Sequence, residues 1–166
     1  MQTYVALAIV GLSLQGVAAA KAQPPQQPPT PQSQAEARQR AAIKAVLESY
    51  EQALNASDVE GVVQLYTGDA VLLPPNAASA VGIDAVRATY TGIFRAIDLD
   101  LTFEIAEVSV VSPDWAFLRS SSKGVVTILA NGARIPSNNH ELFVLHRTRG
   151  GWKLARYSFS SILPAS

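Results

Sequence analysis

Glu141 is the side chain of this sequence best placed to do chemistry, and it lies in the stretch His140–Ser160. That stretch predicts two strands joined by a tight turn at Arg149-Gly150-Gly151, because glycine reaches backbone angles that other residues avoid. Side chains alternate along a strand, so Glu141 would share one face with Phe143 and Leu145. A carboxylate on an otherwise apolar face indicates either a face that meets water or a face that lines a cavity.

Two further sets of polar side chains neighbour Glu141 in the predicted sheet. Asn139 shares the face of Glu141, where it could bind a carbonyl group or complete the hydrogen bonds at the strand end. Arg119, Ser121 and Lys123 form a polar stripe on one face of the preceding strand. Such a stripe is either a solvated face or, at a cavity mouth, a site that suits an acidic ligand.

Length and composition exclude several classes of protein. The chain has 166 residues, two histidines, no cysteine and a formal net charge of zero, which predicts one domain of ordinary size. Without cysteine, no disulfide forms and no thiol can act as a nucleophile or metal ligand. A nucleic-acid partner requires a basic face, which this charge balance does not predict. No His, Asp and Glu cluster has metal-ligand spacing, so we expect no metal and no cofactor.

The N-terminus predicts an export signal followed by a linker. Tyr4–Ala19 is an apolar run too short to span a membrane comfortably, and Ala20-Lys21-Ala22 fits a signal-peptide cleavage pattern. We therefore expect residues 1–22 to be a signal peptide and the domain to be periplasmic or secreted, with an uncleaved membrane anchor as the alternative. Residues 23–34 are rich in proline and glutamine, which predicts a semi-extended tether outside the core.

The remaining residues, 35–163, predict helices followed by long strands. Three helices are expected. Apolar residues at helical spacing mark Ala35–Ala56, a capping box that begins at Ser57 marks a short helix to about Tyr66, and Gly82 opens a third helix that runs to about Ile97. Alternation and turn residues mark the strands: Ala70–Leu73, Leu99–Val110, Trp115–Leu129, Arg134–Arg147 and Trp152–Ser161.

The order of these elements predicts an α+β fold with helices packed on one face of a curved antiparallel sheet. The apolar alternation changes phase after Ile105, which predicts a β-bulge that bends the sheet. A bent sheet with helices across its concave side encloses a cone, and the mouth of such a cone is a common ligand site. We expect Leu72, on the short first strand, and Phe143 to line it.

At this point the chain resembles the nuclear transport factor 2-like superfamily, in its ketosteroid isomerase and SnoaL-like polyketide cyclase branch. The resemblance covers about Ala35–Ser161 and is closest to exported members, some labelled SgcJ/EcaC-type oxidoreductases. It depends on motifs in a fixed order: Tyr50-Glu51-Gln52-Ala53-Leu54, Asp58–Tyr66, Asp69-Ala70-Val71, Gly82 and the final Gly151-Trp152-Lys153-Leu154. Nothing in the chain resembles a redox-cofactor motif.

The resemblance implies roles for particular residues. In the isomerases a tyrosine on the first helix donates to an oxyanion, and Tyr50 matches it, while Tyr66 and Tyr90 match two further tyrosines of its hydrogen-bond network. A protonated acid on a late strand completes the oxyanion hole; counting from the two neighbouring turns places either Glu141 or Phe143 there. The isomerase general base corresponds to Pro74, which cannot take a proton.

Two interpretations of Tyr50 and Glu141 remain open from the sequence. In the first, the Tyr50 hydroxyl and a neutral Glu141 stabilise an enolate in a dry site. In the second, Tyr50 is a core residue and an ionised Glu141 pairs with Arg156 or Arg119 and orients a ligand.

The function expected from these residues is the binding of a small hydrophobic molecule in the cone, with proton-transfer chemistry of the isomerase, cyclase or dehydratase kind. The alternatives are a carrier without catalysis and an interaction module that forms a homodimer through the outer face of the sheet. The predicted catalytic pair is Tyr50 and Glu141. The predicted pocket residues are Tyr66, Leu72, Tyr90, Asn139, Phe143, Arg119 and Arg156.

Overall fold

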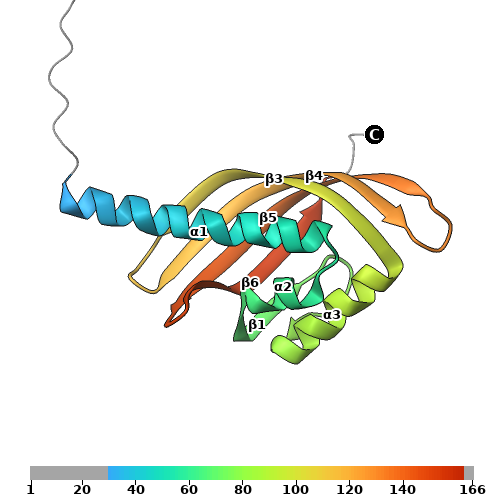
Figure 1. Cartoon of the computed structure of the whole chain (residues 1–166), viewed down its shortest axis with the longest axis horizontal. Helices are drawn as coiled ribbons and strands as arrows, with labels where there is room; N and C mark the ends of the chain where they lie inside the picture. The colour runs from blue at the N-terminus through green and yellow to red at the C-terminus, as the bar shows by residue number, and fades with distance from the viewer. Residues whose placement is uncertain (1–29, 163–166) are drawn as a thin grey trace, which may run out of the picture.

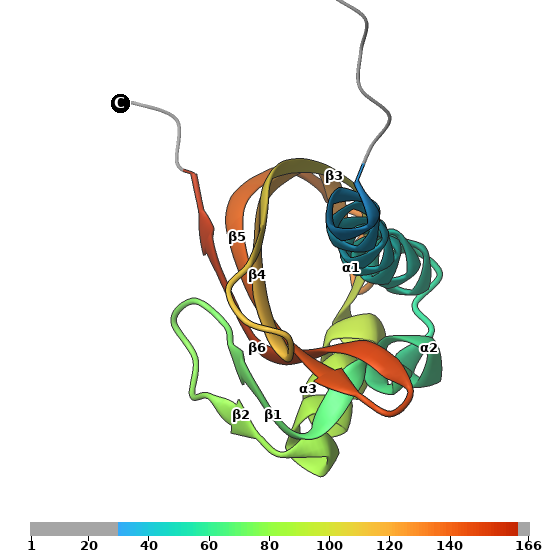
Figure 2. The same ribbon diagram turned by 90° about the vertical axis from the view of Figure 1, so that its left-hand side faces the viewer.

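A curved sheet of six strands, with three helices on its concave side, forms the folded domain, as Figures 1 and 2 show. The computed structural model describes residues 30–162, so the predicted signal peptide and the first part of the predicted linker lie outside the described residues. Its elements are α1 (Pro31–Asn55), α2 (Val59–Gln64), β1 (Tyr66–Leu73), β2 (Ala80–Val81), α3 (Ile83–Ala96), β3 (Ile97–Val110), β4 (Trp115–Ile128), β5 (Arg134–Thr148) and β6 (Gly151–Ser161). The predicted α+β architecture is confirmed.

The strand order is β2-β1-β6-β5-β4-β3. β6, β5, β4 and β3 pair antiparallel in succession, whereas β1 pairs with β6 in parallel. The register of β3 against β4 shifts between Ile105 and Glu107, which confirms the bulge predicted from the change of phase. Bulges bend and twist a sheet, and Figure 2 shows the resulting arc with α1 across its open side.

Helix α1 begins at Pro31, four residues before the predicted start at Ala35. Proline is tolerated in the first turn of a helix because the N–H it lacks has no partner there, and Thr30 caps this end by accepting a hydrogen bond from the Ser33 N–H. The predicted tether therefore contributes its last residues to the helix. Further along, Ile43, Leu47, Tyr50 and Leu54 form the buried face that packs on the sheet.

The second helix differs from the prediction at both ends. Asp58, not Ser57, is its N-cap, because the Asp58 side chain accepts from the Gly61 N–H while Ser57 has a positive φ of 53°. The helix ends at Gln64, and Tyr66, where we expected the helix to end, is already the first residue of β1.

Side chains of α1 complete the hydrogen bonds of β3, the edge strand of the sheet. The Asn55 amide accepts from the Leu101 N–H at 2.9 Å and donates to the Leu101 carbonyl at 2.7 Å, as a neighbouring strand would. Glu51 accepts from the Phe103 N–H at 2.9 Å. An open edge exposes unpaired backbone groups, so these contacts both protect the edge and join α1 to the sheet along one wall of the cone.

Candidate functional site

A cavity of about 310 Å³ lies between α1, α3 and the concave face of the sheet. Its wall is mostly apolar, and its polar groups are a few hydroxyls, one amide and one carboxyl group. The lining residues are Tyr50, Leu54, Leu72, Pro74, Pro75, Tyr90, Ile93, Ile97, Leu99, Leu101, Phe103, Val126, Ser137, Asn139, Glu141, Tyr157, Phe159 and Ser161. An apolar hollow with a few convergent polar groups is the usual form of a small-molecule site.

Glu141 lies on the concave face of β5 and contributes to this cavity. It is 3% exposed and shares that face with Phe143 and Leu145, whereas Leu142 on the opposite face is 45% exposed. The predicted alternation along this strand is therefore confirmed. The face that carries Glu141 could have met water or lined a cavity, and the structure shows that it lines a cavity.

Both oxygens of Glu141 accept a hydrogen bond from a buried hydroxyl on a neighbouring strand. Ser122 on β4 donates to Oε1 at 2.5 Å, and Tyr157 on β6 donates to Oε2 at 2.5 Å. Burial raises the pKa of Glu141, and these two hydrogen bonds oppose the rise because they stabilise the ionised form. The result is a carboxyl group whose pKa lies above its ordinary value.

The ion pair that one of the two interpretations gives to Glu141 is wrong. Arg119 pairs with Glu107 at 3.3 Å, and Arg156 pairs with Asp69 at 3.6 Å, both on exposed surface. The reason is strand alternation: each arginine follows or precedes an inward-facing residue of its strand, so its own side chain points away from the cone. Neither arginine lines the cone cavity, which corrects their prediction there, although Arg119 lines a second, more open hollow that also includes Glu141.

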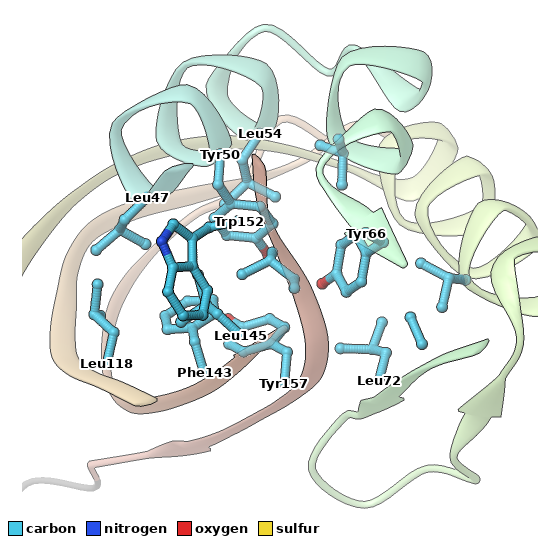
Figure 3. Close-up of a cluster of buried hydrophobic side chains, with 14 of the residues drawn as sticks. Leu47, Tyr50, Leu54, Tyr66, Leu72, Leu118, Phe143, Leu145, Trp152 and Tyr157 are labelled. Carbon is cyan, nitrogen blue, oxygen red and sulfur yellow. The ribbon is translucent and has the colours of Figure 1, made fainter. Parts of the chain in front are cut away.

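Three tyrosines from three different elements form a hydrogen-bonded chain beside the carboxyl group. The Tyr90 hydroxyl of α3 lies 2.8 Å from the Tyr50 hydroxyl of α1 and 2.8 Å from the Tyr66 hydroxyl of β1. Burial raises the pKa of all three hydroxyls well above the ordinary value, so each stays neutral and able to donate. Figure 3 shows Tyr50 pointing from α1 toward Phe143 and Tyr157 of the sheet, with ring-centroid distances of 5.7 and 5.6 Å.

Asn139 also faces the cavity and connects to Glu141 through Ser122. Its Nδ2 donates to the Ser122 hydroxyl at 3.1 Å and to the Ser137 hydroxyl at 3.2 Å. Asn139 lies inside β5 and not at its end, so its hydrogen bonds to these serine side chains differ from the strand-end bonds that were one of its two predicted uses. Its position in the cavity wall is compatible with the other predicted use, the binding of a carbonyl group.

The structure brings most of the predicted site residues together. Tyr50, Leu72, Tyr90, Asn139 and Glu141 line the cavity. Tyr66 and Phe143 are buried behind that wall, in contact with Tyr90 and Tyr50 respectively. Pro74 lies in the wall as well, so no carboxylate stands at the position that the resemblance gives to a general base.

Sequence reasoning missed Tyr157 and Ser122, the two hydroxyls that hold Glu141. The signal was present in the strand pairing. With the turn at Arg149-Gly150, Phe143 pairs with Tyr157, and Ser122 pairs with Asn139, so both hydroxyls lie diagonally across from Glu141 on the same face. Counting the strand register from the turns at the two ends of β5 therefore identifies Ser122 and Tyr157 as neighbours of Glu141.

Other kinds of site find no support in residues 30–162. No group of three or more His, Asp or Glu side chains in this part of the chain could hold a metal ion. Within the same residues, no helix is long and apolar enough to cross a membrane.

A cone of curved sheet, closed by three N-terminal helices and holding tyrosines and one buried carboxyl group, defines a protein of the nuclear transport factor 2-like superfamily. Within it, the chain belongs to the SnoaL-like domain family, whose model matches residues 46–157. Both the superfamily and the branch predicted from the sequence are confirmed. No curated protein sequence matches the chain.

Solved structures agree with this assignment. A ketosteroid isomerase-like protein from Erwinia carotovora atroseptica SCRI1043 is 38% identical and superimposes with a TM-score of 0.73 over 76% of this chain and 98% of its own. A dehydratase candidate of the NTF2-like family from Streptomyces avermitilis is 18% identical, with a TM-score of 0.66 over 78% of this chain and 99% of its own. A candidate scytalone dehydratase from Novosphingobium aromaticivorans is 17% identical, with a TM-score of 0.70 over 79% and 89%. The last two likenesses show the fold alone.

Proposed function

We propose that the cone binds a small, uncharged, largely apolar molecule and that Glu141 transfers a proton on it. The observation that carries this proposal is a carboxyl group, 3% exposed, in the wall of an apolar cavity and without a cationic partner among the ion pairs of residues 30–162. Proton transfer by one such group fits an isomerase, cyclase or dehydratase.

Hydrogen-bond donors around Glu141 favour a proton acceptor. Ser122 and Tyr157 both donate to its oxygens, which stabilises the ionised form, and burial keeps that form basic. The role differs from the neutral donor that the resemblance implies. With Pro74 in place of a second carboxylate, Glu141 is, within residues 30–162, the only lining carboxyl group that can both take and return a proton.

The tyrosine chain supplies the second half of the chemistry. In the proposed step the carbon–hydrogen bond next to a substrate carbonyl breaks, its proton moves to Glu141, and its electron pair forms an enolate. The negative charge then lies on the carbonyl oxygen, where the Tyr50 hydroxyl, linked to Tyr90, donates a hydrogen bond. Return of the proton to another carbon completes an isomerisation. In a dehydration, the enolate instead expels the hydroxyl group of the adjacent carbon, which takes the proton from Glu141 and leaves as water.

The cavity wall also limits the class of ligand. Among the described residues, none that lines the cavity is Lys, Arg or His, so nothing there would neutralise a phosphate or a carboxylate. Five of the lining residues carry aromatic rings, and these favour flat, apolar ring systems: Tyr50, Tyr90, Phe103, Tyr157 and Phe159. The isomerase-like and dehydratase-like names of the structural neighbours support the same reaction classes.

Hydrogen–deuterium exchange on a small ketone tests the proposal. The purified protein is incubated with β-tetralone in D₂O, and NMR follows loss of the protons next to the carbonyl. We expect the protein to accelerate exchange, Glu141→Gln to slow it by about 100-fold or more, and Tyr50→Phe by about tenfold or more. Glu104→Gln, an exposed carboxylate of β3, serves as the matched control and should leave exchange unchanged. Binding of the ketone without accelerated exchange would show a carrier and contradict the proposed reaction.

We propose further that the domain works outside the cytoplasm, because residues 1–22 have the composition of a signal peptide. N-terminal sequencing of the protein from its native compartment tests this: a mature chain beginning at about residue 23 is expected, and an intact Met1 would contradict cleavage. The expected homodimer stays a prediction, which sedimentation at micromolar concentration tests.

A further inference from the structure

Two serines of β4 differ in one respect that bears on Glu141. Ser120 and Ser122 lie on the same face of the same strand and are 2% and 1% exposed. Ser122 hydrogen-bonds to Glu141 and to Asn139, whereas the Ser120 hydroxyl is the one buried side-chain polar atom of the described residues without a partner. Ser122 is not part of the cavity wall, so it acts on a bound molecule only through its two hydrogen-bond partners in that wall, Glu141 and Asn139.

The direction of the Ser122 hydroxyl follows from its partners. The Asn139 Nδ2 group carries only hydrogens to donate, so Ser122 Oγ accepts from it at 3.1 Å. The hydroxyl hydrogen of Ser122 is then free for Glu141 Oε1, 2.5 Å away. If Oε1 carried a proton and donated it to Ser122, the hydroxyl hydrogen of Ser122 would have to point toward the hydrogens of the Asn139 amide, which repel it. The hydrogen-bond network therefore opposes protonation of Oε1.

The other oxygen of the carboxyl group is held from the opposite side. Tyr157 of β6 donates to Oε2 at 2.5 Å, so the two carboxyl oxygens of Glu141, on β5, accept hydrogen bonds from the strands on either side, β4 and β6. Two donors on different strands fix the plane of the carboxylate, because rotation about its last bond would break both hydrogen bonds.

We propose that Ser122, oriented by Asn139, is a positioning residue that holds Glu141 ionised and correctly turned as the proton acceptor. The catalytic consequence rests on the proposed function, but the effect of Ser122 on the ionisation of Glu141 does not. The two serines are almost equally buried but are not equivalent, because Ser122 donates a hydrogen bond to the Glu141 carboxylate and the Ser120 hydroxyl has no partner.

The surroundings of Glu141 make its ionisation a clean measurement. On the cavity side, the titratable groups that face it are Tyr50 of α1, Tyr66 of β1, Tyr90 of α3 and Tyr157 of β6, and their pKa values are all raised well above the ordinary value. They stay neutral wherever a carboxyl group titrates. Arg119 and His140 line a second hollow with Glu141, but both are exposed on the opposite face of the sheet. Burial raises the pKa of Glu141, and the hydrogen bond from Ser122 is the larger of the two effects that lower it.

Carbon NMR of the protein labelled at glutamate carboxyl groups tests the proposal without any substrate. The Glu141 resonance is assigned by its disappearance in Glu141→Gln and followed through a pH titration in the parent and three serine variants. Loss of one hydrogen bond to a charged group is expected to move the midpoint in Ser122→Ala upward by about one to two pH units. Ser122→Thr, which keeps a hydroxyl, should restore the parent midpoint, and Ser120→Ala should leave it unchanged.

Two results would overturn the proposal: an unchanged midpoint in Ser122→Ala, or an equal upward movement in Ser120→Ala, which would trace the effect to packing alone. The deuterium-exchange assay separates this question from the reaction itself. A shifted midpoint without any exchange in the parent protein would support the role of Ser122 and refute the proposed reaction. With exchange present, the pH at which the rate rises should move with the NMR midpoint in Ser122→Ala.

Discussion

Removal of the Asn55 side chain tests whether α1 is joined to the sheet by hydrogen bonds that replace a missing strand. Asn55→Ala deletes two hydrogen bonds, 2.9 and 2.7 Å long, and leaves the Leu101 N–H and carbonyl without their partners at a partly buried edge. A net contribution of about 0.5–1.5 kcal/mol for each bond gives a loss of about 1–3 kcal/mol in the free energy of unfolding. For a domain of this size, that loss lowers Tm by about 3–10 °C.

The matched control is Asn138→Ala, an exposed asparagine within β5, for which we expect a change within about 0.5 kcal/mol. Urea denaturation followed by tryptophan fluorescence gives the free energies, and calorimetry gives Tm. Asn55→Asp keeps the acceptor for the Leu101 N–H but loses the donor, so it should lie below the parent as well. A loss in Asn55→Ala no larger than that in Asn138→Ala would refute the idea that α1 closes this edge.

Two further predictions concern stability. Because the folded state raises the pKa of Glu141 above its ordinary value of 4.5, it holds a proton that the unfolded chain has lost, so stability falls as pH rises through the folded pKa. Glu141→Gln should remove that fall, so the stability of this variant relative to the parent should grow from acid to neutral pH. Urea titrations at several pH values measure it, with Glu104→Gln as the control. Gly124→Ala should lower the free energy of unfolding by about 1–3 kcal/mol, since a Cβ there would lie 1.9 Å from the Asp100 carbonyl oxygen. Gly92→Ala, in open space on α3, should raise it by about 0.5–1 kcal/mol. Equal changes in the two variants would refute the close contact at Gly124.

The fold could be predicted because each part of it leaves a local signal in the sequence. The buried stripe of α1, the change of phase after Ile105 and the glycine turns all depend on residues close together in the chain. The errors were local too. Ser57 and Asp58 both suit an N-cap, and only the backbone geometry of the loop between α1 and α2, which leaves Ser57 with a φ of 53°, decides for Asp58.

The site was harder to predict because its chemistry depends on register between strands. Alternation places Glu141 on one face with Phe143 and Leu145 but does not decide whether that face meets water or lines a cavity, and one of the two interpretations pairs Glu141 with an arginine because opposite charge is the simplest expectation. Strand alternation turns Arg119 and Arg156 outward, and the partners are hydroxyls of Ser122 and Tyr157 instead. Serine and tyrosine occur at many positions, so only the pairing of β4, β5 and β6 distinguishes these two.

The position of Glu141 is itself an argument for function. Its neighbours on the same face of β5, Phe143 and Leu145, are each 1% exposed, so an apolar side chain at 141 would suit the core and avoid the cost of burying a charge. The chain instead supplies a donor from each adjacent strand, in matching register, to keep a carboxyl group there. A leucine at 141, with apolar side chains in place of the two donors as well, would avoid this cost, and a residue that breaks the local pattern with dedicated support is the kind found at functional sites.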